Sequence, residues 1–226
     1  MNSMIQEEFN KRQEDIETII DLVEALVCGT TLDILSEEGD IKQFDYNERL
    51  INSLVSVISL ITYNQIESTM RGGIEALYDD IADNNISYEE LRETIQKEVL
   101  SGILRKYESG RNLHTAIQNK LSLKIPGLSL NIKKVFNGNI DSEKVYKVRD
   151  TYGLNLTTRP TDRNGVDITD FKDARNDLAH GNISFSEFGS SHPHNEIIDK
   201  SRRVSGYLKS VITAFDNCIE EKNYRS

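Results

Sequence analysis

The segment between residues 46 and 82 constrains the fold of this chain more than any other. It contains the most apolar stretch of the sequence, Leu50 to Ile61, which is interrupted by serines. A stretch of this length is far too short to cross a bilayer. It predicts instead a long helix at the centre of a helical core. Gly72 and Gly73, inside the same helix, indicate a close approach of a neighbouring helix or a local break.

Helical periodicity continues along most of the chain. Residues 4–28 carry apolar side chains at three-and-four spacing and end near Gly29, which predicts an amphipathic helix. The Ser87–Glu90 segment has the pattern of a capping box, and it opens a helix to about Tyr107. The remaining expected elements are a short helix at 112–123, a helix capped by Asp141 that runs to Tyr152, a mobile polar loop at 157–165, a helix capped by Thr169 and a last helix after 194.

No strand hairpin is expected, so the predicted fold class is all-α. We expect a helical bundle with a long C-terminal helix and a partly irregular insert at about 124–168. A chain of 226 residues can bury its own core without staples, and one domain over 1–226 is the simplest organisation. Cys28 and Cys218 lie far apart on predicted apolar helix faces. This placement favours two buried, reduced thiols over a disulfide.

The N-terminus is acidic and amphipathic and lacks the basic-then-apolar pattern of a secretion signal. We therefore expect a cytoplasmic protein that has no membrane segment. We also expect that it uses no cofactor. The net charge of -10 disfavours nucleic-acid binding, because phosphate recognition is largely electrostatic.

The charge is unevenly distributed along the chain, however. Residues 1–100 contain 22 acidic and 7 basic side chains, whereas residues 101–150 contain 4 acidic and 10 basic ones. Four lysines of this basic segment are candidates for weak substrate contacts: Lys133, Lys134, Lys144 and Lys147. A solvated face of lysines is an equal alternative.

The block Arg175-Asn176-Asp177-Leu178-Ala179-His180, followed by Gly181, carries the chemistry. Imidazole shuttles protons near neutral pH, guanidinium supplies a fixed charge for phosphate, and a carboxamide orients them. These groups can direct a ribose 2′-OH onto its own phosphate without a metal, with a 2′,3′-cyclic phosphate (or 3′-phosphate) and a 5′-OH as products. Arg175, His180 and Asn176 are therefore candidate catalytic residues, with Asp177 in support.

Helix geometry does not bring all three groups to one phosphate. Asn176 and His180 share a face at a spacing of four, whereas Arg175 points about 140° away from His180. Either the helix end distorts near Gly181, or a second copy completes the site across a two-fold axis, and we expect the second. The spacing alone is weakly specific. A histidine that caps the helix and an arginine in a surface ion pair are the structural alternative.

The block resembles the signature of the HEPN superfamily, an arginine followed four to six residues later by histidine. The segment Phe136-Asn137-Gly138-Asn139-Ile140-Asp141 is similar to a branch with an insert before the motif helix. The resemblance implies a helical bundle that dimerises through its motif helices and cleaves RNA without a metal. It also implies a toxin or anti-phage defence role and an antitoxin or other regulatory partner.

The residue after Gly181 and the polar residues of the central helix bear on the resemblance. One branch carries a tyrosine two residues after the histidine, but this chain has Asn182 there. An earlier helix often presents a polar residue to the motif, which makes Glu67 and Asn64 candidate supporting residues, although Glu67 is equally suited to pair with Arg71. The alternative to an RNase is a non-catalytic module that binds RNA, a nucleotide or a protein, with a structural motif.

Overall fold

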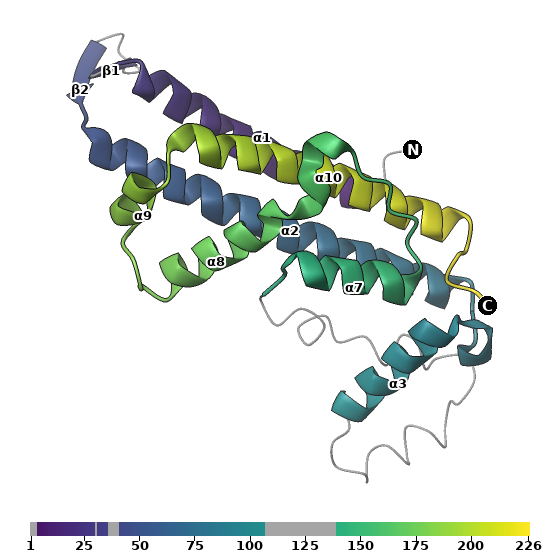
Figure 1. Ribbon diagram of the computed structural model, residues 1–226. Helices are drawn as coiled ribbons and strands as arrows, with labels where there is room; N and C mark the ends of the chain where they lie inside the picture. Colours follow the sequence, from purple (N-terminus) through teal and green to yellow (C-terminus); the bar gives the residue numbers. More distant parts are fainter. Residues whose placement is uncertain (1–3, 30, 36–40, 107–138) are drawn as a thin grey trace.

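The computed structural model describes residues 4–29, 31–35, 41–106 and 139–226. Three long helices lie side by side and form the body of the molecule: α1 (Met4–Val27), α2 (Glu48–Asp83) and α10 (His194–Glu220). Among the shorter helices, α8 (Asp167–Ala179) and α9 (Phe185–Ser191) pack against α2. The helix α7 (Ser142–Tyr152) lies beside α8, and α3 (Glu93–Lys106) packs against α7 (Figure 1). The expected all-α bundle with a long C-terminal helix is confirmed.

The central position of α2 follows from its sequence. Buried residues occupy nearly every turn from Val55 to Ile81, and the helix packs against α1, α8, α9 and α10. Its first turn is capped by Asn47, whose side chain accepts a hydrogen bond from the backbone N–H of Arg49 at 3.1 Å. The helix expected at 46–82 is therefore present, and it is the core helix.

Small and polar residues on α2 let α10 approach closely. The hydroxyls of Thr62 and Ser201 lie 2.8 Å apart, and Ser205 donates to the Gln65 side chain at 3.2 Å. These four side chains are buried, so their hydrogen bonds offset the cost of removing polar groups from water. The pairs hold the two longest helices in one register.

A two-stranded antiparallel hairpin corrects the expectation that no hairpin exists. Strand β1 (Thr31–Leu35) pairs with β2 (Ile41–Asp45), and Asp33 lies opposite Gln43. The hairpin sits at one end of the bundle and leaves Ile41 and Phe44 exposed. Each strand has only five residues, and apolar patterns this short do not distinguish a strand from a helix.

Several helix boundaries also differ from expectation. The capping box at Ser87 and Glu90 is formed, but it caps a 3-10 turn, Tyr88–Glu90, and α3 begins at Glu93. Thr169 is not a cap, because α8 begins two residues earlier at Asp167. Instead, the Thr169 hydroxyl lies 2.7 Å from that of Ser142 and joins α8 to the start of α7.

The insert is partly within the described residues. The short helix expected at 112–123 lies outside them. Asp141 caps α7 as expected, accepting from the backbone N–H of Lys144 at 3.0 Å. The polar segment at 157–165 contains a second 3-10 helix, Pro160–Gly165, rather than a plain loop.

The two cysteines differ in environment. Cys218 is buried in the core as expected, whereas Cys28 is exposed just after the end of α1, which corrects that part of the expectation. Burial raises the pKa of the Cys218 thiol to about 11.

Candidate functional site

The motif helix α8 ends in a Schellman arrangement. Gly181 adopts a left-handed conformation with φ of 70° and donates to the Leu178 carbonyl at 3.3 Å. The backbone N–H of Asn182 donates to the Asp177 carbonyl at 2.9 Å, and its side-chain amide donates to the Asp177 carboxylate at 3.1 Å. This termination fixes His180 as the last residue before the chain turns.

Arg175 and Asn176 form a joined pair on α8. The Nη1 of Arg175 donates to the Asn176 side-chain oxygen at 3.1 Å, and both residues are half-buried. His180 is exposed, and its backbone N–H donates to the Asn176 carbonyl at 3.0 Å. Among the described residues, its imidazole forms no hydrogen bond or ion pair, so the ring is available for an external partner.

The ring of Tyr63 on α2 packs against the guanidinium of Arg175. The Arg175 Cζ lies 5.6 Å from the centre of the Tyr63 ring, within the range of a cation–π contact. The Tyr63 hydroxyl accepts a hydrogen bond from the backbone N–H of Ile140 at 2.9 Å. Burial raises the pKa of Tyr63, and the negative charge of Glu67 acts in the same direction.

The stretch Tyr63–Glu67 was expected to lie near the motif, but Glu67 and Asn64 were the residues chosen from it, and Tyr63 was not. The only available signal was its position at the start of the polar stretch Tyr63–Glu67 of the core helix. A tyrosine on an apolar helix is usually a core residue, and only the packing of α8 on α2 reveals its second contact.

Among the described residues, no hydrogen bond or ion pair joins the two supporting residues expected on α2 to the motif. Glu67 forms an ion pair with Arg71 at 2.5 Å, as the alternative reading predicted. Asn64 is exposed. Both line a cleft of about 600 Å³ between α1 and α2.

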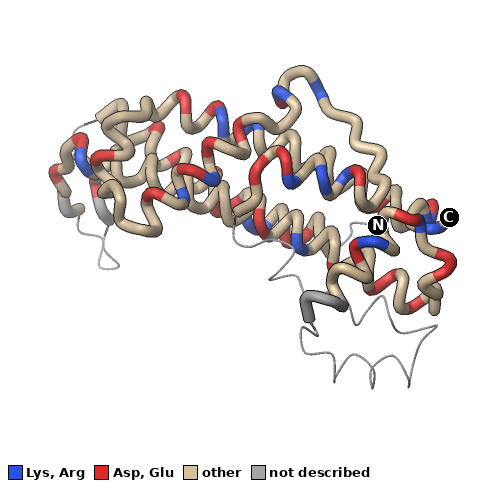
Figure 2. Tube along the Cα trace, turned by 60° about the horizontal axis from the view of Figure 1, so that its bottom comes forward, with Lys and Arg blue, Asp and Glu red and all other residues tan. Residues whose placement is uncertain are grey.

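The lysines proposed as substrate contacts are only partly described. Lys133 and Lys134 lie outside the described residues. Lys144 donates to the carbonyl of Asn139, and Lys147 is exposed on α7. Figure 2 shows Lys and Arg interspersed with Asp and Glu over the described part of the chain.

Lys172 is an additional cation on α8, three residues before Arg175. Its ammonium lies 3.1 Å from the Asp173 carboxylate and 3.8 Å from that of Asp141. The hydrogen bond to Asp173 raises the pKa of Lys172, against the opposing effect of burial. The contact with Asp141 ties the motif helix to the first turn of α7.

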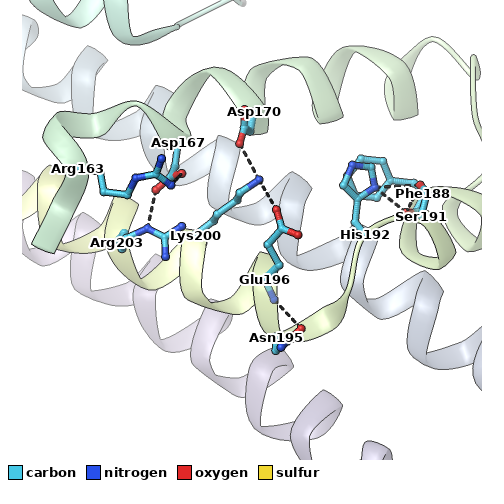
Figure 3. A network of polar contacts seen from close by, with 10 residues as sticks. All are labelled: Arg163, Asp167, Asp170, Phe188, Ser191, His192, Asn195, Glu196, Lys200 and Arg203. Carbon is cyan, nitrogen blue, oxygen red and sulfur yellow. Dashed lines mark hydrogen bonds and ion pairs between the residues drawn. The ribbon is translucent and has the colours of Figure 1, made fainter.

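A polar network fastens the other side of α8 to α10 (Figure 3). The Asp167 carboxylate lies 3.3 Å from Arg163 and 2.7 Å from Arg203. Lys200 bridges Asp170 and Glu196, with both distances at 2.8 Å. Burial acts to lower the pKa of Lys200, but these two hydrogen bonds outweigh it and raise that pKa.

The histidine of the segment that follows the motif, His192, has structural contacts. His192 stacks on Phe188 with ring centres 4.1 Å apart, and its Nδ1 lies 2.8 Å from the Phe188 carbonyl oxygen. Within the described residues, no group of three or more His, Cys, Asp or Glu side chains is arranged to hold a metal ion. None of the helices described is long and apolar enough to span a bilayer.

The sequence matches a known protein family over almost its whole length. A family model described as MAE_28990-like HEPN matches residues 1–224. No curated protein and no solved structure matches the chain. The helical bundle and the late motif helix agree with that match, which spans nearly the whole sequence. The chain therefore belongs to the MAE_28990-like HEPN family.

Proposed function

We propose that this protein is a metal-independent endoribonuclease in which Arg175, Asn176 and His180 are catalytic. The observation that carries the proposal is the exposed imidazole of His180 at the end of α8, one turn beyond the hydrogen-bonded pair of Arg175 and Asn176. These groups combine a proton carrier, a fixed positive charge and an orienting amide.

The proposed reaction is an internal transesterification of RNA. His180 accepts the proton of a ribose 2′-OH, and the 2′-oxygen forms a bond to the adjacent phosphorus. The bond between phosphorus and the 5′-oxygen breaks. This oxygen takes a proton from a protonated His180, which on the dimer proposal is the partner's His180. Arg175 stabilises the charge that develops on the phosphate oxygens. The products are a 2′,3′-cyclic phosphate and a 5′-OH end.

We propose a homodimer as the active form. Arg175 is held against α2, whereas His180 projects from the exposed end of α8. A second copy related by a two-fold axis would place two motif helices around one phosphate, so that the groups of both chains act together. On this proposal each chain is a single domain that is inactive alone.

The biological role proposed is that of a cytoplasmic toxin or anti-phage effector. A nuclease of this kind would damage its own cell if it were not controlled, so an antitoxin or another regulatory protein is the expected partner, with RNA as the substrate. The alternative is a binding module with a structural motif. The excess of acidic side chains in residues 1–100 supports it, because an acidic surface fits a protein partner better than RNA. The hydrogen bond between Asn182 and Asp177 supports it as well, because it gives a motif residue a structural contact.

The test uses purified wild-type, His180→Ala and Arg175→Ala proteins with a pool of tRNA and mRNA in EDTA, followed by end-group analysis. His192→Ala is the matched control, because this histidine lies outside the motif. Fragments with cyclic phosphate and 5′-OH ends from wild type and His192→Ala alone are expected. Full cleavage by His180→Ala would refute the proposal. If the wild type cleaves no RNA and His180→Ala has a lower melting temperature than the wild type, the structural alternative is favoured.

A further inference from the structure

Arg175 contacts another helix through its charged end. Its guanidinium lies against the ring of Tyr63, which is fully buried in the middle of α2. An arginine side chain has many rotamers, and a flat aromatic surface restricts them while it attracts the positive charge. The ring therefore selects among the positions that the guanidinium can occupy.

Tyr63 is itself held by a second element. Its hydroxyl accepts the backbone N–H of Ile140, which directly precedes the cap of α7. The start of α7 is in turn fixed to α8 by Asp141 and Lys172, at 3.8 Å, and by the hydroxyls of Ser142 and Thr169, at 2.7 Å. Three segments distant in sequence thus meet around one tyrosine ring, and that ring has little freedom to move.

We propose that Tyr63 is a positioning residue, whose ring orients the Arg175 guanidinium for contact with the reacting phosphate. The inference rests on the proposed function, since it assigns a role relative to Arg175. It separates two properties of the tyrosine. The ring acts on Arg175, whereas the hydroxyl acts on Ile140 and stabilises the junction.

Two substitutions distinguish these properties. Tyr63→Phe keeps the ring but leaves the buried N–H of Ile140 without its acceptor, so the melting temperature falls while kcat stays within about twofold. Tyr63→Leu removes the ring as well, and kcat falls by about 2- to 30-fold, the range that corresponds to a cation–π contact. The KM for RNA is expected to change little, because the substitution leaves the Arg175 charge in place.

Tyr78→Leu provides the matched control. Tyr78 lies on the same helix, is similarly buried and sits four turns away from Tyr63 by the helical rise of about 5.4 Å per turn. It is expected to lower the melting temperature without lowering kcat. If kcat follows the melting temperature across all three variants, or if Tyr63→Leu keeps full kcat, the positioning role is wrong.

A measurement independent of catalysis separates this inference from the proposed function. The Nε–H signal of Arg175 in an NMR spectrum is assigned by its loss in Arg175→Lys. The signal should keep its ring-shifted position in Tyr63→Phe and move toward that of an unrestrained arginine in Tyr63→Leu. An unchanged signal in Tyr63→Leu would overturn the inference even if RNA is cleaved. Absence of wild-type cleavage with the expected signal change would refute the nuclease function alone.

Discussion

Gly73 of α2 lies against the ring of Phe215 of α10, so closely that a Cβ on Gly73 would come within 2.4 Å of the ring carbons. The neighbouring Gly72 has open space by comparison, because its Cβ would meet Ile5 at 3.9 Å. We expect Gly73→Ala to lower the free energy of unfolding by about 1–3 kcal/mol, since the ring or a helix must shift. Gly72→Ala should raise it by up to about 1 kcal/mol through helix propensity.

Urea denaturation of the two alanine variants and the wild type checks this prediction. The pair controls for the change in propensity, which is the same at both positions. Equal effects of the two substitutions would show that the close approach of α2 and α10 is absent in solution.

The buried hydroxyls of Thr62 and Ser201 provide a second test. We expect Thr62→Val or Ser201→Ala alone to cost about 1–3 kcal/mol, because each leaves the partner hydroxyl buried without its hydrogen bond. The double variant should cost clearly less than the sum of the two. A double-mutant cycle by chemical denaturation measures this coupling, and strict additivity would contradict the hydrogen bond.

The helix end at Gly181 predicts a different dependence on residue type. Gly181→Ala should destabilise the protein by about 1–2 kcal/mol, because an L-residue is strained at a φ of 70° although the side chain would meet nothing within 4 Å. Gly181→Asn should cost less, since asparagine tolerates this conformation. RNA cleavage should follow the same order, because this turn holds His180. Melting curves and cleavage rates of both variants provide the test, and a fully active, fully stable Gly181→Ala would contradict it.

The two thiols should react differently in the folded protein. At pH 8 a disulfide reagent should label Cys28 alone, because Cys28 is exposed and Cys218 is buried. Both should react in guanidinium chloride. The Cys28→Ser and Cys218→Ser variants assign the two phases, and fast labelling of Cys218 in the folded state would contradict the packing.

The pKa of Cys218 also predicts a loss of stability at alkaline pH. Burial raises this pKa from 9.0 to about 11 in the folded state. Between these values the unfolded thiol binds fewer protons than the folded one. Its contribution to stability is therefore complete below pH 9 and is lost as the pH rises toward 11. Guanidinium denaturation across this range should show a smaller decline in Cys218→Ala than in the wild type, and equal declines would refute the prediction.

The long helices could be predicted from the sequence because each carries a continuous buried stripe. The helix expected at 4–28 is α1, and the one expected at 46–82 is α2 within two residues at each end. The α9 helix was missed, because its Gly and Ser content masked the capping box formed by Ser184 and Glu187. The hairpin was missed because its two five-residue strands are too short for periodicity to identify.

The site could be predicted only in part, since the sequence contains the motif but not its surroundings. The order Arg175, Asn176, His180 on one helix, with Gly181 beyond the end, is as expected. The residue that contacts Arg175 differs from the two that were expected. Glu67 and Asn64 are the residues with polar chemistry, yet Tyr63 makes the contact. The side of a helix that meets a partner about 110 residues later depends on tertiary packing, which periodicity alone does not determine.

The position of α2 has a consequence for how the chain folds. Its neighbour α1 is separated from it only by the short hairpin, but α8, α9 and α10 come more than 80 residues after its end. Contacts over such separations form late, because closing long loops is entropically costly. We therefore expect α1 and α2 to associate first and the last three helices to dock onto them in the final step. Arg175 gains its aromatic support only in that step, so a partly folded chain has the motif but not the arrangement that the proposed chemistry requires.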